Sequence, residues 1–78
     1  MDRDNLVKMA NRIASFFEAM PTEAEAQQEV CNHLRKFWAP TMRAELVAEI
    51  DVGGATGLHP LVRGAVTRLR ADLLAPGA

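Results

Sequence analysis

Few residues of this chain belong to the types that most often hold metals. Cys31 is the only cysteine, and His33 follows it by two positions in a segment with helical periodicity. Side chains two apart on a helix project about 200° from each other, so these two cannot share one ion. Glu29 and His33 are four apart and face the same side, but two ligands without a third make a weak site. We therefore expect no metal ligands here, and a structural or surface role for Cys31 and His33.

The other polar residues do not form a catalytic group. No serine or cysteine has a recognisable base with an orienting acid. Gly53-Gly54 lacks the lysine and the spacing of a phosphate-binding loop. His59 precedes Pro60, and we expect it to mark the start of a helix. The sequence thus predicts no catalytic residue and no cofactor-binding residue, and the isolated chain is not expected to be an enzyme.

Size and composition narrow the class of protein further. The 78 residues are predicted to form a single domain over 1–78, and 49% of them are hydrophobic. That share is generous for a domain with so little interior, so part of the apolar surface is expected to contact another protein. A net charge of −1 does not fit a nucleic-acid-binding chain. No membrane-length apolar run and no signal peptide are present, which together with one cysteine favours a cytoplasmic protein without a membrane partner.

Helical periodicity dominates the chain and predicts an all-α fold. The first helix is predicted over 5–20, with Asp4 as its N-cap and Pro21 as its end. Its apolar residues fall within an arc of about 120°. These residues are Leu6, Met9, Ala10, Ile13, Phe16, Phe17 and Met20.

Three more helices are predicted after it. The second covers 23–38 and begins with a capping box formed by Thr22 and Glu25. Its inward stripe is Ala26, Val30, Leu34 and Phe37. The third covers 41–51, and the fourth covers 60–75, where Pro76-Gly77 ends it. Four short helices with short connections predict a compact bundle made of two αα-hairpins.

One candidate interface lies where the second helix meets the third. It contains Arg35, Lys36, Trp38 and Arg43. Trp38 lies at the edge of the apolar stripe, so it either covers the core between the two helices or anchors a partner, and both roles are compatible. Trp and Arg are over-represented among the residues that dominate binding energy.

The fourth helix offers a second candidate interface. Arg63 and Arg70 are seven residues apart and share one stripe, where they either meet a partner or are solvated. Gly64 lies between them, and glycine inside a helix costs about 0.5–1 kcal/mol relative to alanine. Close approach of another chain would explain this glycine, and so would a loosely constrained position. The predicted interface residues are therefore Arg35, Lys36, Trp38, Arg43, Arg63, Gly64 and Arg70.

Several blocks of sequence resemble a known family. They comprise residues 6–13, the Phe-Phe-x-x-Met-Pro block at 16–21, the block at 33–43 with Phe-Trp-x-Pro-x-Met-Arg, and residues 57–62 with Ala65-Val66 beyond them. Together they resemble the delta subunit of soluble NAD-dependent formate dehydrogenases that contain molybdenum or tungsten. One departure is Ala39, where the family pattern has an acidic residue that would cap the third helix.

The resemblance implies a cofactor-free subunit of a larger enzyme. In that family the large alpha subunit carries the bis-pyranopterin metal centre and iron–sulfur clusters, beta carries FMN and the NAD site, and gamma carries a further cluster. The single cysteine agrees with this, because an iron–sulfur cluster ordinarily needs four thiolates. The predicted function is that of a non-catalytic accessory subunit that docks on alpha and supports assembly, cofactor retention or stability of the complex.

Two alternatives stand beside this hypothesis. One is a transient assembly chaperone for the same enzyme, which the stoichiometry of the mature enzyme would reveal. The other is a small nucleic-acid-binding regulatory domain that uses Arg35, Lys36 and Arg43, against which the net charge argues. The choice between a permanent and a transient partner, and between molybdenum and tungsten, stays open at this point.

Overall fold

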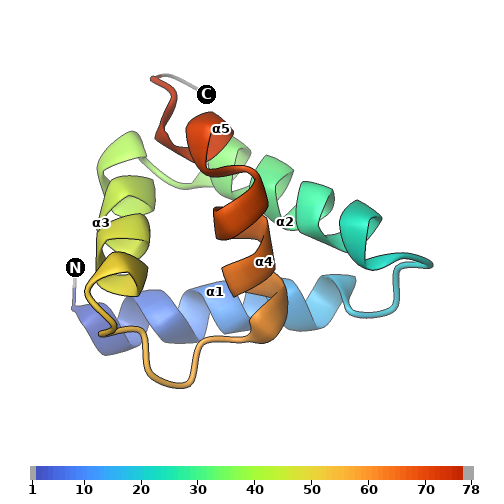
Figure 1. Ribbon diagram of the computed structural model, residues 1–78, viewed down its shortest axis with the longest axis horizontal. Helices are drawn as coiled ribbons and strands as arrows, with labels where there is room; N and C mark the ends of the chain where they lie inside the picture. The colour runs from blue at the N-terminus through green and yellow to red at the C-terminus, as the bar shows by residue number, and fades with distance from the viewer. Residues whose placement is uncertain (1, 77–78) are drawn as a thin grey trace.

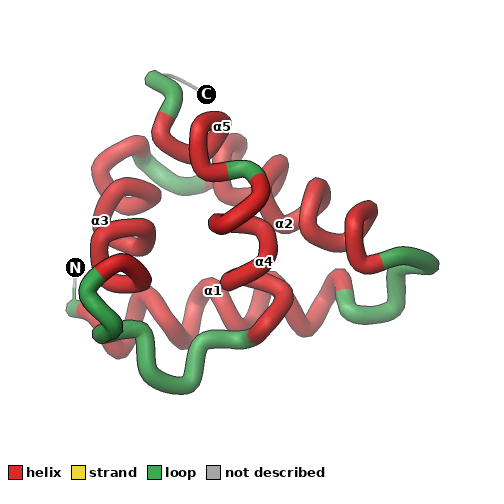
Figure 2. The backbone as a smooth tube through the Cα atoms, viewed as in Figure 1, coloured by secondary structure: helices red, strands yellow, loops and turns green. Residues whose placement is uncertain are grey.

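The computed structural model describes residues 2–76. Met1, Gly77 and Ala78, which belong to the predicted domain, lie outside the described residues, and so does the predicted helix-ending role of Gly77. The described chain contains helices and no strand, which confirms the all-α prediction (Figure 2). Its helices are α1 (Arg3–Phe17), α2 (Glu23–Phe37), α3 (Pro40–Asp51), α4 (Pro60–Arg68) and α5 (Arg70–Leu74).

The first turns of the helices follow capping chemistry. Asp2, and not Asp4, is the N-cap of α1, because its side chain accepts a hydrogen bond from the Asp4 amide at 3.1 Å. The Thr22 hydroxyl accepts from the Glu25 amide at 3.1 Å, as the capping-box pattern predicts. Ala39 supplies no side-chain cap to α3, which begins directly at Pro40.

The predicted first helix is too long at its carboxyl end. It was expected to reach residue 20, but α1 ends at Phe17 and residues 18–22 form the connection to α2. Pro21 has no amide to donate to the carbonyl of Phe17, four residues earlier, and this carbonyl accepts from the Met20 amide at 3.1 Å in a tighter last turn. Pro21 also disfavours helical backbone at Met20. Pro40 acts in the same way on Ala39, whose backbone is extended, and α2 ends at Phe37.

The predicted fourth helix is divided in two. The prediction was a single helix over 60–75, whereas α4 ends at Arg68 and α5 starts at Arg70. Leu69 between them has φ −116° and ψ 28°, outside the helical range. The change of direction turns α5 toward α3, with which it packs, and places Leu73 in the core.

The helices surround one hydrophobic core. In Figure 1, α1 and α2 diverge from their connection at residues 18–22, α3 lies at the open end and α4 lies in front. Contacts join α4 mainly to α2, and α3 to both α5 and α1. Every helix contributes apolar side chains to the core, among them Leu6, Ala10, Val30, Leu34, Leu46, Val62, Val66 and Leu73. None of the described helices is long and apolar enough to span a membrane.

Candidate partner-binding surface

Two of the predicted interface residues lie inside the molecule. Trp38 is buried and belongs to the core, which fits the first of its two predicted roles. Arg43 on α3 is only 1% exposed, and its Nη2 lies 3.4 Å from the carbonyl oxygen of Ala75. In the isolated chain neither side chain is presented to solvent.

Arg35 and Arg43 act together on the last helix. The Arg35 guanidinium donates to the carbonyl oxygen of Asp72, while Arg43 reaches that of Ala75. The last carbonyls of a helix have no partner within the helix, and basic side chains satisfy them well. The two arginines therefore hold α5 against α2 and α3.

Gly64 is approached closely by the chain itself. A Cβ at this position would overlap the side-chain amide of Gln27, which is buried on α2. Gln27 also accepts a hydrogen bond from Nε of Arg68 at 2.7 Å, and Arg68 donates to the carbonyl of Ala24 at 3.0 Å. Arg68 therefore joins the end of α4 to α2. The close approach proposed for Gly64 thus comes from α2.

Arg63 and Arg70 both have partners within the chain. Arg63 Nη2 donates to the carbonyl oxygen of Ala55 at 2.7 Å and so ties the glycine-rich connection to α4. Arg70 binds both carboxylate oxygens of Asp51, at 2.8 and 2.5 Å. The hydrogen bonds from Arg70 lower the pKa of Asp51, and those to Asp51 raise the pKa of Arg70. This pair joins the end of α3 to the start of α5.

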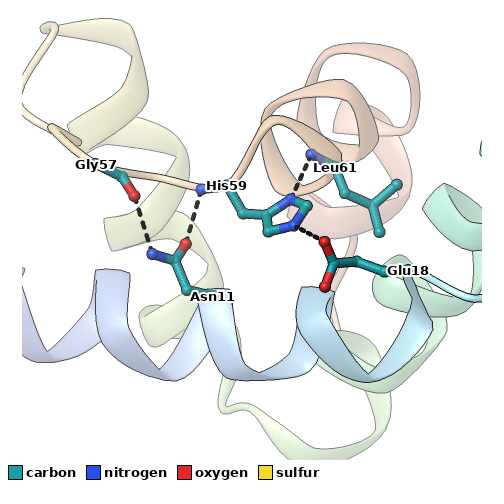
Figure 3. A network of polar contacts seen from close by, with 5 residues as sticks. All are labelled: Asn11, Glu18, Gly57, His59 and Leu61. Atoms are coloured by element: carbon teal, nitrogen blue, oxygen red, sulfur yellow. Dashed lines mark hydrogen bonds and ion pairs between the residues drawn. The ribbon is translucent and has the colours of Figure 1, made fainter.

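A polar network fixes the start of α4 on α1 (Figure 3). The Asn11 amide donates to the carbonyl of Gly57 at 2.9 Å and accepts from the His59 backbone amide at 2.7 Å. The His59 ring caps α4, as its Nδ1 accepts from the amide of Leu61 at 3.0 Å. Because Nδ1 accepts, the neutral ring carries its proton on Nε2, which lies 3.0 Å from a carboxylate oxygen of Glu18. The prediction that His59 starts a helix is confirmed, and the network around it is structural.

Two phenylalanines that were predicted to face inward lie on the surface. Phe16 is 80% exposed and Phe37 is 65% exposed. On α1 the core contacts only the side that carries Leu6, Val7, Ala10 and Ala14, and Phe16 lies at the far edge of the wider apolar arc. Phe37 is the last residue of α2, at the end where α2 has diverged from α1 (Figure 1).

The exposed phenylalanines are connected by a row of rings that we call the aromatic patch: Phe16, Phe17, His33 and Phe37. Phe16 and Phe17 meet edge to face with centroids 5.0 Å apart, and Phe17 lies 6.3 Å from the His33 ring. His33 and Phe37 have centroids 4.6 Å apart. Nζ of Lys36 lies 5.6 Å from the centroid of the Phe37 ring. Of the predicted interface residues, Lys36 is the one that lies at this surface.

The patch borders a shallow open hollow of about 250 Å³ between the end of α1 and one face of α2. Its lining comprises Phe17, Glu29, Asn32, His33, Lys36 and Phe37. Periodicity places both exposed phenylalanines on apolar faces and so predicts them in the core. The size of a phenylalanine side chain, set against the small core of a chain this short, is the signal that could have identified them as surface residues.

The titratable residues in the rest of the described chain form no candidate metal site, and the one thiol is buried. No three His, Cys, Asp or Glu side chains among the described residues gather where they could hold a metal ion. Cys31 is fully buried, and this burial is the main cause that raises the pKa of its thiol. A buried neutral thiol of this kind packs as a small apolar side chain.

The comparison with known families gives one match. Residues 5–66 match the model of the NADH-dependent formate dehydrogenase delta subunit, FdsD. Searches of curated proteins and of solved structures gave no significant match. The matched range contains the whole aromatic patch and most of α4, while α5 lies beyond it. Since the match covers well over half of the chain, the chain belongs to the family of delta subunits of NADH-dependent formate dehydrogenase.

Proposed function

We propose that this chain is a non-catalytic accessory subunit that docks on the large alpha subunit of an NAD-dependent formate dehydrogenase, with the beta and gamma subunits in the same complex. The observation that carries the proposal is the family match over residues 5–66. The exposed phenylalanines support it, because a small chain that leaves large apolar side chains in water gains free energy when a partner covers them.

The proposed complex holds its cofactors in the other subunits: a bis-pyranopterin molybdenum or tungsten centre, iron–sulfur clusters and FMN. This chain's own residues do not fit a cluster, because Cys31 is its only thiol and is buried in the core. We place the complex in the cytoplasm, which agrees with a chain that has a single cysteine and so no internal disulfide.

The proposed mechanism is thermodynamic linkage. A subunit that binds only the folded, cofactor-loaded form of alpha shifts the equilibrium toward that form, by about 2.7 kcal/mol when its concentration is 100 times Kd. Lys36 meets the partner directly in this proposal. The other predicted interface residues contribute indirectly in this proposal, because their contacts within the chain hold the helices in place. They are Arg35, Trp38, Arg43, Arg63, Gly64 and Arg70.

The test is to produce the dehydrogenase with and without this chain. Without it, we expect a lower metal content per alpha subunit and faster thermal loss of formate-dependent NAD reduction. Full metal content and unchanged thermal stability in its absence would contradict the proposal. Stoichiometric co-purification identifies a permanent subunit, whereas loss of the chain from the mature, metal-loaded enzyme identifies the transient chaperone.

A further inference from the structure

We infer that the aromatic patch is the docking surface of this chain, and that its occupant is an apolar segment of a partner protein that is bordered by carboxylates. The inference rests on the proposed function, under which the partner is another subunit of the dehydrogenase. It replaces the surface around Trp38 and Arg43, which the fold has buried.

The first support is the excess of apolar surface on α1. The core takes up the side of the helix that carries Leu6, Val7, Ala10 and Ala14. The remaining apolar residues of the helix are only partly covered: Met9, Ile13 and Phe17 are half-buried, and Phe16 is exposed. Met20, just beyond the helix, is half-buried as well. No element among residues 2–76 therefore packs over Phe16, on the far side of α1.

The second support is the arrangement of the rings. Phe16 and Phe37 lie on different helices, yet Phe17 and His33 join them into one continuous surface. Aromatic side chains that are held by their neighbours lose little conformational freedom when a partner binds, which makes them effective anchors. Other exposed apolar residues, Val52 and Leu74, lie outside this row.

Charge determines the chemistry of the occupant. Arg12 lies one helical turn before Phe16 on the same stripe of α1, and Lys36 lies over the Phe37 ring. Neither cation has a carboxylate within ion-pair distance in the described part of the chain. A partner with apolar side chains at its centre and Asp or Glu at its border would satisfy both.

The same charges disfavour a second copy of this chain as the occupant. Twofold pairing through the patch would gather two copies each of Arg12 and Lys36 around one interface. Glu29 is the acidic residue that lines the hollow, and two copies of it would face those four cations. A different, acidic partner avoids this repulsion.

The experiment measures binding of the full-length chain to the dehydrogenase subunits assembled without it. Phe16→Ser with Phe37→Ser should weaken the affinity about 30-fold or more, the size of effect expected for two binding anchors. Val52→Ser is the matched control, because Val52 is 77% exposed and lies outside the patch, and it should leave the affinity unchanged. Arg12→Glu with Lys36→Glu should slow association about tenfold at low salt and flatten its salt dependence.

The outcomes distinguish the docking surface proposed here from the proposed function. Circular dichroism of every variant first establishes that it keeps the helical content of the wild type. If wild type binds and the double serine variant binds equally well, the patch is not the docking surface, and the proposed function survives. If wild type binds no dehydrogenase subunit, both proposals fail. A wild-type dimer that the serine variant separates into monomers would overturn the inference in favour of a second copy.

Discussion

At the scale of single residues, side chains that looked available for a partner are used inside the molecule. Arginines are the clearest case, because a guanidinium has five donors and a long flexible stem, so it reaches carbonyls that no local pattern reveals. Arg35 and Arg43 donate to backbone carbonyls in and just after α5, far along the chain from both arginines. Arg63 donates to a carbonyl in the connection before its own helix. A basic residue in a segment with helical periodicity is therefore weak evidence for an interface.

His59 provides the first residue-scale prediction. His59→Ala removes the side-chain cap of α4 and should lower the free energy of unfolding by about 0.5–2 kcal/mol. His59→Asn should retain most of that stability, because an asparagine oxygen also accepts from the first turn. Glu18→Gln should cost less than about 1 kcal/mol, since Glu18 is largely exposed. Urea denaturation of the full chain measures all three, and equal losses for Ala and Asn would rule out the cap.

Gly64 provides the second. Alanine in an ordinary helix position is more stable than glycine by about 0.5–1 kcal/mol. Here a Cβ displaces the Gln27 amide and breaks its bond to Arg68, a bond to a charged group worth about 1.5–3 kcal/mol. Gly64→Ala should therefore destabilise the wild type but stabilise a Gln27→Ala background. A double-mutant cycle by thermal unfolding measures this reversal of sign, and equal effects in both backgrounds would contradict it.

At the scale of elements, α5 was predicted only as the last part of a single helix over 60–75, and no periodicity indicated that it is separate from α4. It is five residues long, too short to be stable by itself, and depends on tertiary contacts. Leu73 anchors it in the core, Arg35 and Arg43 bind its last carbonyls, and Arg70 joins it to Asp51. These contacts come from α2 and α3, so the helix forms only when those elements are in place.

The packing of α5 gives a matched pair of substitutions. Leu73 is 1% exposed, and Leu73→Ala should lower stability by about 2–5 kcal/mol through lost burial and a cavity. The adjacent Leu74 is 46% exposed, and Leu74→Ala should cost less than about 1 kcal/mol. Chemical denaturation distinguishes them. Similar losses at both positions would mean that α5 does not pack on the core as described.

The Asp51–Arg70 pair predicts a dependence on pH. The pKa of Asp51 is lowered in the folded chain, mainly by its hydrogen bonds with Arg70. A lowered carboxyl pKa contributes stability above the unfolded pKa, and that contribution is lost as the pH falls through the folded pKa. Asp51→Asn should therefore be less stable than the wild type at neutral pH and equally stable in acid. Thermal unfolding across that range tests this, and a difference that persists in acid would assign the effect to another cause.

At the scale of the whole molecule, a small core and a large apolar composition are in conflict. A domain of this size buries only about 60–65% of the surface of its unfolded chain. The core accommodates leucines, valines and alanines from all the helices, while Phe16 and Phe37 remain outside it. A partner that covers these rings would relieve the conflict, which is the physical reason for expecting a subunit.

Hydrogen exchange tests this at the level of the whole chain. If the partner covers the aromatic patch, amides in the carboxyl-terminal halves of α1 and α2 should exchange more slowly in the complex than in the free chain, beyond the general stabilisation given by linkage. The amides around Val52, at the end of α3, should show only the general effect. Protection concentrated at α3 and α5 would place the partner on the opposite elements.

The sequence alone determined the class of fold, the starts of α2 at Glu23 and α4 at Pro60, and the family. Those properties are local: periodicity, capping side chains and prolines act within a few residues, and the family blocks are contiguous. The capping role of Thr22 and the helix start at His59 could be read directly for this reason.

The tertiary structure decided which apolar side chains are covered and which basic ones are free. No proline or glycine marks the break of the last predicted helix at Leu69. After the break, α5 packs on α3 and α2 with Leu73 in the core. Phe16 and Phe37 have the spacing of core residues. Phe16 is exposed because the core contacts another side of α1, and Phe37 because it lies at the end of α2 that has diverged from α1 (Figure 1). A face is buried only if another element reaches it, and that depends on contacts between residues far apart in the chain.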